Sequence, residues 1–214
     1  MTDYQPTSRR PIADAFRATA RRAVELCVRA NVHPDTISYL SIVAAGLAGI
    51  AFWQSRRFPA LLIAAPLLCY LRLWFNMLDG MVALASGKAS KKGEIVNELP
   101  DRVSDILVFA GVAHSGWCHP LCAYWAMILA LLTAYVGTLG QAVAGRREFG
   151  GIMSKPWRMV ALHIGAWTTY ALIIFDRLPV VGSLTLLDWT NLLIIVGCIQ
   201  TVWVRLRNTL THLN

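Results

Sequence analysis

Two adjoining stretches decide the fold: Asn76-Met-Leu-Asp79-Gly80-Met-Val-Ala83-Leu84 and, eight residues later, Gly93-Glu-Ile-Val-Asn97-Glu-Leu-Pro-Asp101. The first stretch ends a long apolar block, and the second leads into another. Polar or small residues recur in both at steps of three or four, which places them on one face of each predicted helix. These residues are Arg72, Asn76, Asp79 and Ala83 on the first helix, and Gly93, Asn97, Asp101 and Asp105 on the second. Two such faces form a cage of carboxylate and amide oxygens, the ligands that Mg²⁺ or Mn²⁺ prefers.

Around these stretches the composition is that of a membrane protein. Hydrophobic residues make up 56% of the 214 residues and charged residues only 15%, and the apolar residues form blocks near the length of about 20 that a span needs. The predicted spans are Thr36–Gln54, Ala60–Ala85, Asp101–His114, Cys122–Gly145, Val160–Phe175 and Trp189–Val204. The third is the weakest, because its charged residues at 101, 102 and 105 must face the bundle interior. We predict an all-α polytopic protein with six transmembrane helices.

The segment before the first span forms a separate unit in this interpretation, residues 1–35, ahead of a six-helix domain at 36–214. Apolar residues recur at helical spacing in Ile12–Ala30, namely Ile12, Phe16, Ala20, Val24 and Val28, and Arg10, Arg17, Arg21 and Arg22 fall on other faces. This pattern predicts an amphipathic helix lying on an anionic membrane surface. An ordinary solvated, charged helix is the alternative.

The basic residues indicate the orientation. With a cytosolic N-terminus, cytosolic segments hold fifteen Lys and Arg and the opposite side holds three. This bias predicts that both termini and the Asn76–Asp105 region lie on the cytosolic side of the membrane. It also accounts for the net charge of +8, so the charge does not call for a nucleic-acid partner, and no alternation of aromatic and basic residues suggests one.

The two stretches resemble the signature of the CDP-alcohol phosphotransferase family, D-x-x-D-G-x-x-A-R, eight residues, G-x-x-x-D-x-x-x-D. The spacing fits without a gap, and five of the eight specified positions match. More loosely, the family is similar in length, has six spans and places its signature from span two into span three. Its members often enter span one with a Pro-Asn-x-x-Thr-like segment, which His33-Pro34-Asp35-Thr36-Ile37-Ser38 approximates.

The resemblance implies a metal-dependent enzyme of phospholipid biosynthesis in the bacterial inner membrane. Such enzymes displace CMP from a CDP-linked donor by attack of an acceptor alcohol, and we expect CDP-diacylglycerol as the donor. By the family's roles, Asp79 and Asp101 would hold Mg²⁺ or Mn²⁺ on the pyrophosphate, and Asp101 would also be the general base. Gly80, Ala83 and Gly93 would let the nucleotide approach the helix backbone.

Three positions depart from the signature. Asn76 and Asn97 replace aspartates and remain metal ligands through their carbonyl oxygens, while Leu84 replaces the arginine. The lost negative charge favours one metal ion over two, unless it is supplied by Glu94, Glu98 or Asp105. Arg72 or Lys88 could stand in for the arginine, and a structural role for Arg72 as counter-ion to Asp79 is an equal alternative.

Outside the signature, Lys155 and Arg158 follow a Gly-Gly pair on a predicted cytosolic loop. They suit binding of a phosphorylated acceptor alcohol or of a lipid phosphate, although the bias of basic residues towards the cytosol also explains them. Gly137, Gly140 and Gly145 in span four are candidates for close helix packing or for a homodimer face.

Three functions remain open from the sequence. The first is an active phosphatidyltransferase in contact with membrane lipids. The second is a catalytically weakened relative that binds lipid or nucleotide or serves as a partner subunit, because the two asparagines and the missing arginine reduce the charge of the site. The third is a small transporter, because polar residues in spans also mark ion paths.

Overall fold

The computed structural model describes the backbone of residues 13–213 and the side chains of residues 20–90, 93 and 95–213. Over these residues the chain forms seven helices and one short hairpin. The elements are α1 (Ala13–Arg29), α2 (Pro34–Gln54), α3 (Leu61–Ala85), α4 (Lys91–Ala113), α5 (Pro120–Ala144), α6 (Lys155–Ile174), β1 (Val180–Val181), β2 (Leu184–Thr185) and α7 (Leu186–Thr211). Arg10 and Ile12 of the predicted amphipathic helix, and the side chains of Phe16 and Arg17, lie outside the described residues.

Local sequence signals start the helices that carry the site. The Ser90 side chain accepts a hydrogen bond from the Gly93 amide at 3.1 Å and so caps α4. Pro34 and Pro156 occupy the first turns of α2 and α6, where a missing N–H costs nothing. Because of the Ser90 cap, α4 begins at Lys91, before the predicted span start at Asp101, and the whole Gly93–Asp101 stretch is helical, as its four-residue spacing predicts.

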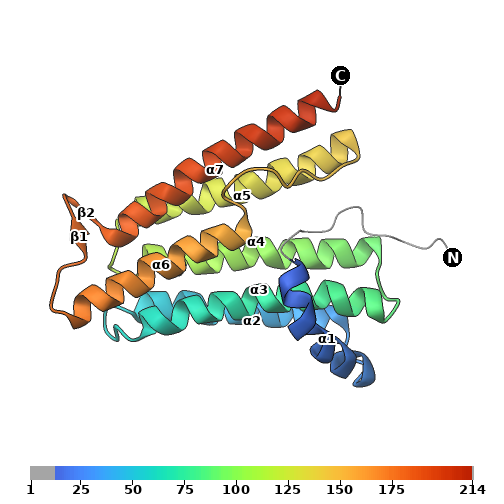
Figure 1. The fold of residues 1–214 in the computed structure, drawn as a ribbon, viewed down its shortest axis with the longest axis horizontal. Coiled ribbons are helices and arrows are strands. Elements are labelled where there is room, and N and C mark those ends of the chain that lie inside the picture. Colours follow the sequence, from blue (N-terminus) through green and yellow to red (C-terminus); the bar gives the residue numbers. More distant parts are fainter. Residues whose placement is uncertain (1–12, 214) are drawn as a thin grey trace.

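The long helices form two groups of three (Figure 1). In one group α2 packs against α3 and α4, and in the other α7 packs against α5 and α6. The groups meet where α6 contacts α3 and where α5 contacts α4. A tight crossing joins α2 and α4 at Gly49 and Gly111, where a Cβ on either glycine would overlap the backbone of the facing helix. This crossing holds α4, and with it the second signature stretch, against α2.

The outer surface is apolar in the way that a lipid-facing surface requires. Four helices of the described chain, α2, α3, α5 and α7, are long and apolar enough to cross a membrane. On α2 the large residues Tyr39, Val43, Leu47 and Ile50 are exposed and lie along one face. Asp101 and Asp105 of α4 and Arg158 of α6 are instead buried, so these ionisable side chains point inward. The expectation of an all-helical membrane protein is confirmed.

The N-terminal helix packs onto this bundle. Val24 of α1 is buried in a small cluster with Ile37 of α2 and with Leu78 and Val82 of α3. The Lys88 ammonium, in the loop after α3, donates a 3.0 Å hydrogen bond to the Asn31 side chain. Lys88 therefore contacts the loop after α1. This position does not support the prediction that Lys88 replaces the signature arginine.

The glycines of α5 face the interior of the chain. A Cβ on Gly137 would lie 3.1 Å from the Arg205 guanidinium, and one on Gly140 would lie 2.9 Å from the Thr209 hydroxyl, both on α7. These glycines therefore allow α5 and α7 to approach each other. The prediction that they form a homodimer face is wrong for Gly137 and Gly140, because that face is already covered within the chain.

Candidate active site

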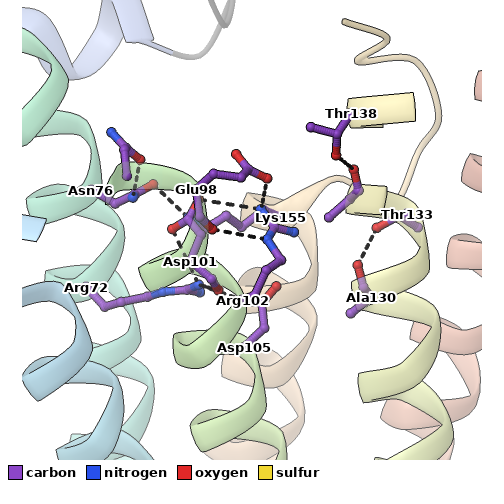
Figure 2. Close-up of polar contacts among 12 residues, drawn as sticks. Arg72, Asn76, Glu98, Asp101, Arg102, Asp105, Ala130, Thr133, Thr138 and Lys155 are labelled. Atoms are coloured by element: carbon purple, nitrogen blue, oxygen red, sulfur yellow. Dashed lines mark hydrogen bonds and ion pairs between the residues drawn. The ribbon is translucent and has the colours of Figure 1, made fainter. Parts of the chain in front are cut away.

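The two signature stretches meet at one end of α3 and α4, and α6 covers the same place. Figure 2 shows Arg72 and Asn76 of α3 facing Asp101 and Asp105 of α4, with Lys155 of α6 reaching into the group. Asp79, Asp101, Asp105, Arg72 and Lys155 are all buried. Ionised groups are costly to bury unless they are paired, so the partners of each define what the site can do.

Asp79 is fixed by three donors. Its Oδ1 accepts from the Gly80 amide at 2.6 Å and from the Asn97 side chain at 2.9 Å, and its Oδ2 accepts from the Ser38 hydroxyl at 2.5 Å. Ser38 belongs to α2, so the carboxylate joins three helices. Sequence reasoning did not assign a role to Ser38, although it lies in the His33–Ser38 segment that approximates the family's entry to span one.

The two asparagines of the signature bond to each other across the α3–α4 contact. Asn76 Nδ2 donates to Asn97 Oδ1 at 3.2 Å. The Asn97 side chain donates in turn to Asp79. This chain of amides connects Asn76, Asn97 and Asp79, which are three of the four predicted metal ligands.

The fourth signature position is reached through Lys155. Its ammonium donates to Asn76 Oδ1 at 2.7 Å and forms an ion pair with Asp101 Oδ1. The prediction that Lys155 belongs to the site agrees with this position. The Lys155 side chain, however, contacts signature residues directly. It therefore lies closer to the centre of the site than was expected of a lysine in a loop.

Beneath these residues Asp105 holds two arginines. Asp105 Oδ1 accepts from Arg72 at 2.8 Å, and Asp105 Oδ2 accepts from Arg158 at 3.1 Å. Arg72 also donates to the Asp101 backbone carbonyl at 2.9 Å, and Arg158 to Thr133 and to the Met153 carbonyl. Arg72 is thus the counter-ion of Asp105, and the alternative that it neutralises Asp79 is wrong. Asp105 and the two arginines form a buried support for Asp101.

A second ion-pair cluster lies at the rim. Glu98 accepts from Arg147 at 2.8 Å and pairs with Arg102 at 2.8 Å, and Arg102 also lies 3.7 Å from Asp101 Oδ2. Glu98 is therefore neutralised by two arginines and adds little negative charge to the cage. Arg147 was assigned only to topology from the sequence, because nothing local indicates that it reaches α4.

The signature glycine beside Asp79 has no neighbour that requires its small size. Among the described residues, a Cβ on Gly80 would meet no atom within 4 Å, and one on Gly93 would meet the Ser90 hydroxyl at 3.4 Å. Ala83 is half-buried nearby. The open space beside Gly80 is consistent with the expectation that a ligand approaches the backbone there.

The donor atoms present suit a hard divalent cation in their chemistry. Asp79 and Asp101 supply carboxylate oxygens, and Asn76 and Asn97 supply amide oxygens, which Mg²⁺ and Mn²⁺ bind readily. Among the described side chains no cluster of three or more His, Cys, Asp or Glu is placed to hold a metal. The side chain of Glu94, which sequence analysis considered as a further source of charge, is outside the described residues.

Comparison with known proteins agrees with the geometry. No family model matches the chain. The inner membrane protein YnbA of Escherichia coli is 25% identical over 203 residues, covering 95% of this chain and 92% of YnbA. The phosphatidylinositol phosphate synthase of Mycobacteroides abscessus is 29% identical over 159 residues, covering 72% and 70%.

The fold is also that of a solved membrane synthase. The phosphatidylinositol phosphate synthase PgsA1 of Mycobacterium tuberculosis, in complex with manganese and citrate, superimposes with a TM-score of 0.73 at 21% identity, over 90% of this chain and 89% of that one. The same enzyme with CDP-DAG bound gives a TM-score of 0.72. Fold, signature and relatives together define a helical membrane protein with a polar site between α3, α4 and α6. These likenesses agree with the resemblance of the two signature stretches to the CDP-alcohol phosphotransferase family.

Proposed function

We propose that the protein is a phosphatidyltransferase of phospholipid biosynthesis that uses CDP-diacylglycerol and an acceptor alcohol and releases CMP. The observation that carries this proposal is the meeting of Asp79 and Asp101, the two matched acidic signature positions, with Asn76 and Asn97 in one hydrogen-bonded network that Lys155 completes. The open space beside Gly80 supports a nucleotide position next to that network. The relatives named as phosphatidylinositol phosphate synthases support the donor.

In the proposed reaction the acceptor hydroxyl oxygen forms a bond to the phosphorus that carries diacylglycerol. The bond from this phosphorus to the bridging oxygen breaks, and CMP leaves with the electron pair. Asp101 takes the hydroxyl proton as general base. A divalent ion held by Asp79, Asp101 and the two amide oxygens would neutralise charge on the pyrophosphate.

The chain's own residues keep Asp101 in position. Arg72 bonds the Asp101 carbonyl, and Lys155 pairs with its carboxylate, so both the backbone and the side chain of the base are fixed. Arg158, which was expected to bind substrate phosphate, supports the same carboxylate indirectly by holding Asp105. Such fixed geometry reduces the reorganisation needed in the transition state.

We also propose the topology expected from the sequence. All six helices from α2 to α7 cross the membrane, α1 lies at the cytosolic surface, and the site opens to the cytosol. The inward direction of the charges on α4 and α6 supports their role as spans, and the bias of Lys and Arg supports the orientation. YnbA, an inner membrane protein by name, supports the same membrane for this chain.

A second candidate function is a family member without turnover that binds the nucleotide lipid. Two observations favour it: the neutral asparagines, and Leu84, which is exposed where the signature has arginine. The purified protein with CDP-diacylglycerol, Mg²⁺ or Mn²⁺ and a panel of alcohols distinguishes the two. We expect CMP release with at least one acceptor, such as glycerol phosphate, inositol phosphate or serine. Binding of CDP-diacylglycerol without CMP release from any acceptor would favour the second candidate.

A further inference from the structure

The signature site contains a cation that belongs to the protein. Lys155 lies in the first turn of α6, and its ammonium contacts Asn76 Oδ1 at 2.7 Å and Asp101 Oδ1. Asn76 and Asp101 occupy the first and fourth of the four acidic positions in the signature. Oxygen atoms of both would be expected to bind metal, and an ammonium between them occupies that side of the site.

The position of Lys155 is built into the fold. Arg158 lies one turn further along α6 and is fixed by Asp105, Thr133 and the Met153 carbonyl. Residues three apart on a helix lie on the same face, so the contacts of Arg158 aim Lys155 at α3 and α4. Lys155 is buried, and a buried ammonium is stable only with strong partners. Its contacts with Asn76 and Asp101 are therefore part of the native site.

The asparagines complement this cation. Asn76 Nδ2 donates to Asn97 Oδ1 at 3.2 Å, a bond that two ionised aspartates could not make. Two carboxylates so close together repel each other unless a cation lies between them. The amides remove that requirement and leave Asp79 and Asp101 as the carboxylates of the cage. The two carboxylates and the Lys155 ammonium together carry one net negative charge, and Arg72 and Arg102 lie 3.8 and 3.7 Å from Asp101 as further positive charges. This balance suits one divalent ion and disfavours a second.

We propose that Lys155 takes the place of a second divalent cation and limits the site to a single Mg²⁺ or Mn²⁺ ion. The inference rests on the proposed metal site of the phosphatidyltransferase and specifies how that site is charged. It also explains the two asparagines of the signature together. Asn76 and Asn97 are neutral because a lysine from α6 supplies positive charge that a metal ion would otherwise bring.

Mn²⁺ binding to the full-length protein in detergent or nanodiscs tests the inference, by paramagnetic resonance titration and metal analysis. We expect one Mn²⁺ per chain in the wild type. Lys155→Met should raise Mn²⁺ affinity about tenfold, because a repelling charge close to the ion is removed. Lys155→Arg keeps the charge and should stay within about threefold of the wild type. Arg177→Met, which removes an exposed charge from the loop after α6, is the matched control.

A second set of variants restores the carboxylates. Asn76→Asp/Asn97→Asp with Lys155 retained should still bind one Mn²⁺, and the same pair with Lys155→Met should bind two. Thermal unfolding of each variant checks that the fold is kept, and the single Lys155→Met variant decides the question if the triple variant does not fold. Two Mn²⁺ or none in the wild type would overturn the inference, and so would equal affinities of Lys155→Met and Arg177→Met.

CMP release is measured on the same wild-type preparation. Absence of CMP together with the expected Mn²⁺ stoichiometries would count against the proposed enzyme and in favour of the single-ion site. CMP release by a wild type that binds two ions would support the proposed enzyme and count against the single-ion site.

Discussion

Ser38 of α2 donates a 2.5 Å hydrogen bond to Asp79 of α3, across a separation of 41 residues. The first predicted span thereby holds a carboxylate of the signature. We expect Ser38→Ala to lower the free energy of unfolding by about 1–3 kcal/mol, because a buried acceptor loses its donor, and to weaken Mn²⁺ binding. Ser41→Ala is the control, since the Ser41 hydroxyl is also buried on α2 but bonds only its own helix, at the Ser38 carbonyl. Equal unfolding and Mn²⁺ binding in both variants would show that the Asp79 contact has no role.

Removal of one member of the Arg72–Asp105–Arg158 cluster should be severe. Asp105→Asn leaves two buried guanidinium groups facing a neutral amide. Breaking a buried ion pair typically costs about 3–5 kcal/mol, so we expect a large fall in melting temperature in detergent. Glu98→Gln at the half-exposed rim should cost about 1 kcal/mol or less. Melting temperatures that fall equally would contradict the assignment of Asp105 as the structural centre of the site.

Two kinds of glycine should respond differently to alanine. Gly80→Ala places its Cβ in open space, so we expect normal folding with CMP release reduced by about tenfold or more, since the methyl group would meet the nucleotide. The Cβ of Gly111→Ala would overlap the Gly49 backbone. We therefore expect this variant to lower the melting temperature, with any loss of activity following from the loss of stability. Melting curves and CMP assays on the two variants separate these effects. Full activity of Gly80→Ala would contradict the proposed position of the nucleotide beside Gly80.

Cysteine labelling tests the proposed topology. Lys88→Cys should react with an impermeant maleimide only from the cytosolic side, and Arg57→Cys, in the loop between α2 and α3, only from the opposite side. Cys27 and Cys122, which are partly exposed, are replaced by serine in this background. Labelling of Lys88→Cys from the outside would reverse the orientation.

The native Cys118 should stay unlabelled in this experiment. Burial, followed by the nearby charge of Asp188, raises the pKa of the Cys118 thiol to about 12. Maleimide reacts with the thiolate, and at pH 8 a thiol with this pKa is ionised to only about one part in ten thousand. A rise in pH should therefore increase labelling at residue 118 until the thiol approaches its pKa. Rapid labelling at pH 7 would contradict the burial of this loop.

The sequence predicted the helix order and the faces of the site because both depend on local spacing. Asn76 and Asp79 share a face of α3, and Asn97 and Asp101 share a face of α4, as three- and four-residue steps require. The third span was predicted to start only at Asp101, and its charged residues made it the weakest of the six. Asp105, Glu98 and Asp101 are neutralised by partners on α3, at the rim and on α6, which no local pattern contains.

The contacts that complete the site join residues far apart in the chain. Lys155 meets Asn76 across 79 residues, and Arg158 meets Asp105 across 53. From the sequence, both basic residues suited a phosphate site, but the bias of basic residues towards the cytosol was the stronger explanation of them. The direction of Gly137 and Gly140 was likewise open, because small residues favour close packing without specifying whether the partner helix belongs to the same chain.

Asp79 and Asp101 are the two carboxylates on which the proposed transfer of a phosphatidyl group from CDP-diacylglycerol depends. The most direct measurement is formation of labelled phospholipid and CMP from labelled CDP-diacylglycerol by purified wild type, Asp101→Asn and Glu98→Gln with an acceptor panel and Mn²⁺. We predict equal amounts of CMP and new lipid in the wild type, a loss of about a hundredfold or more in Asp101→Asn, and near-normal turnover in Glu98→Gln. Turnover by Asp101→Asn at the wild-type rate, or no lipid product from the wild type with any acceptor, would contradict the claim.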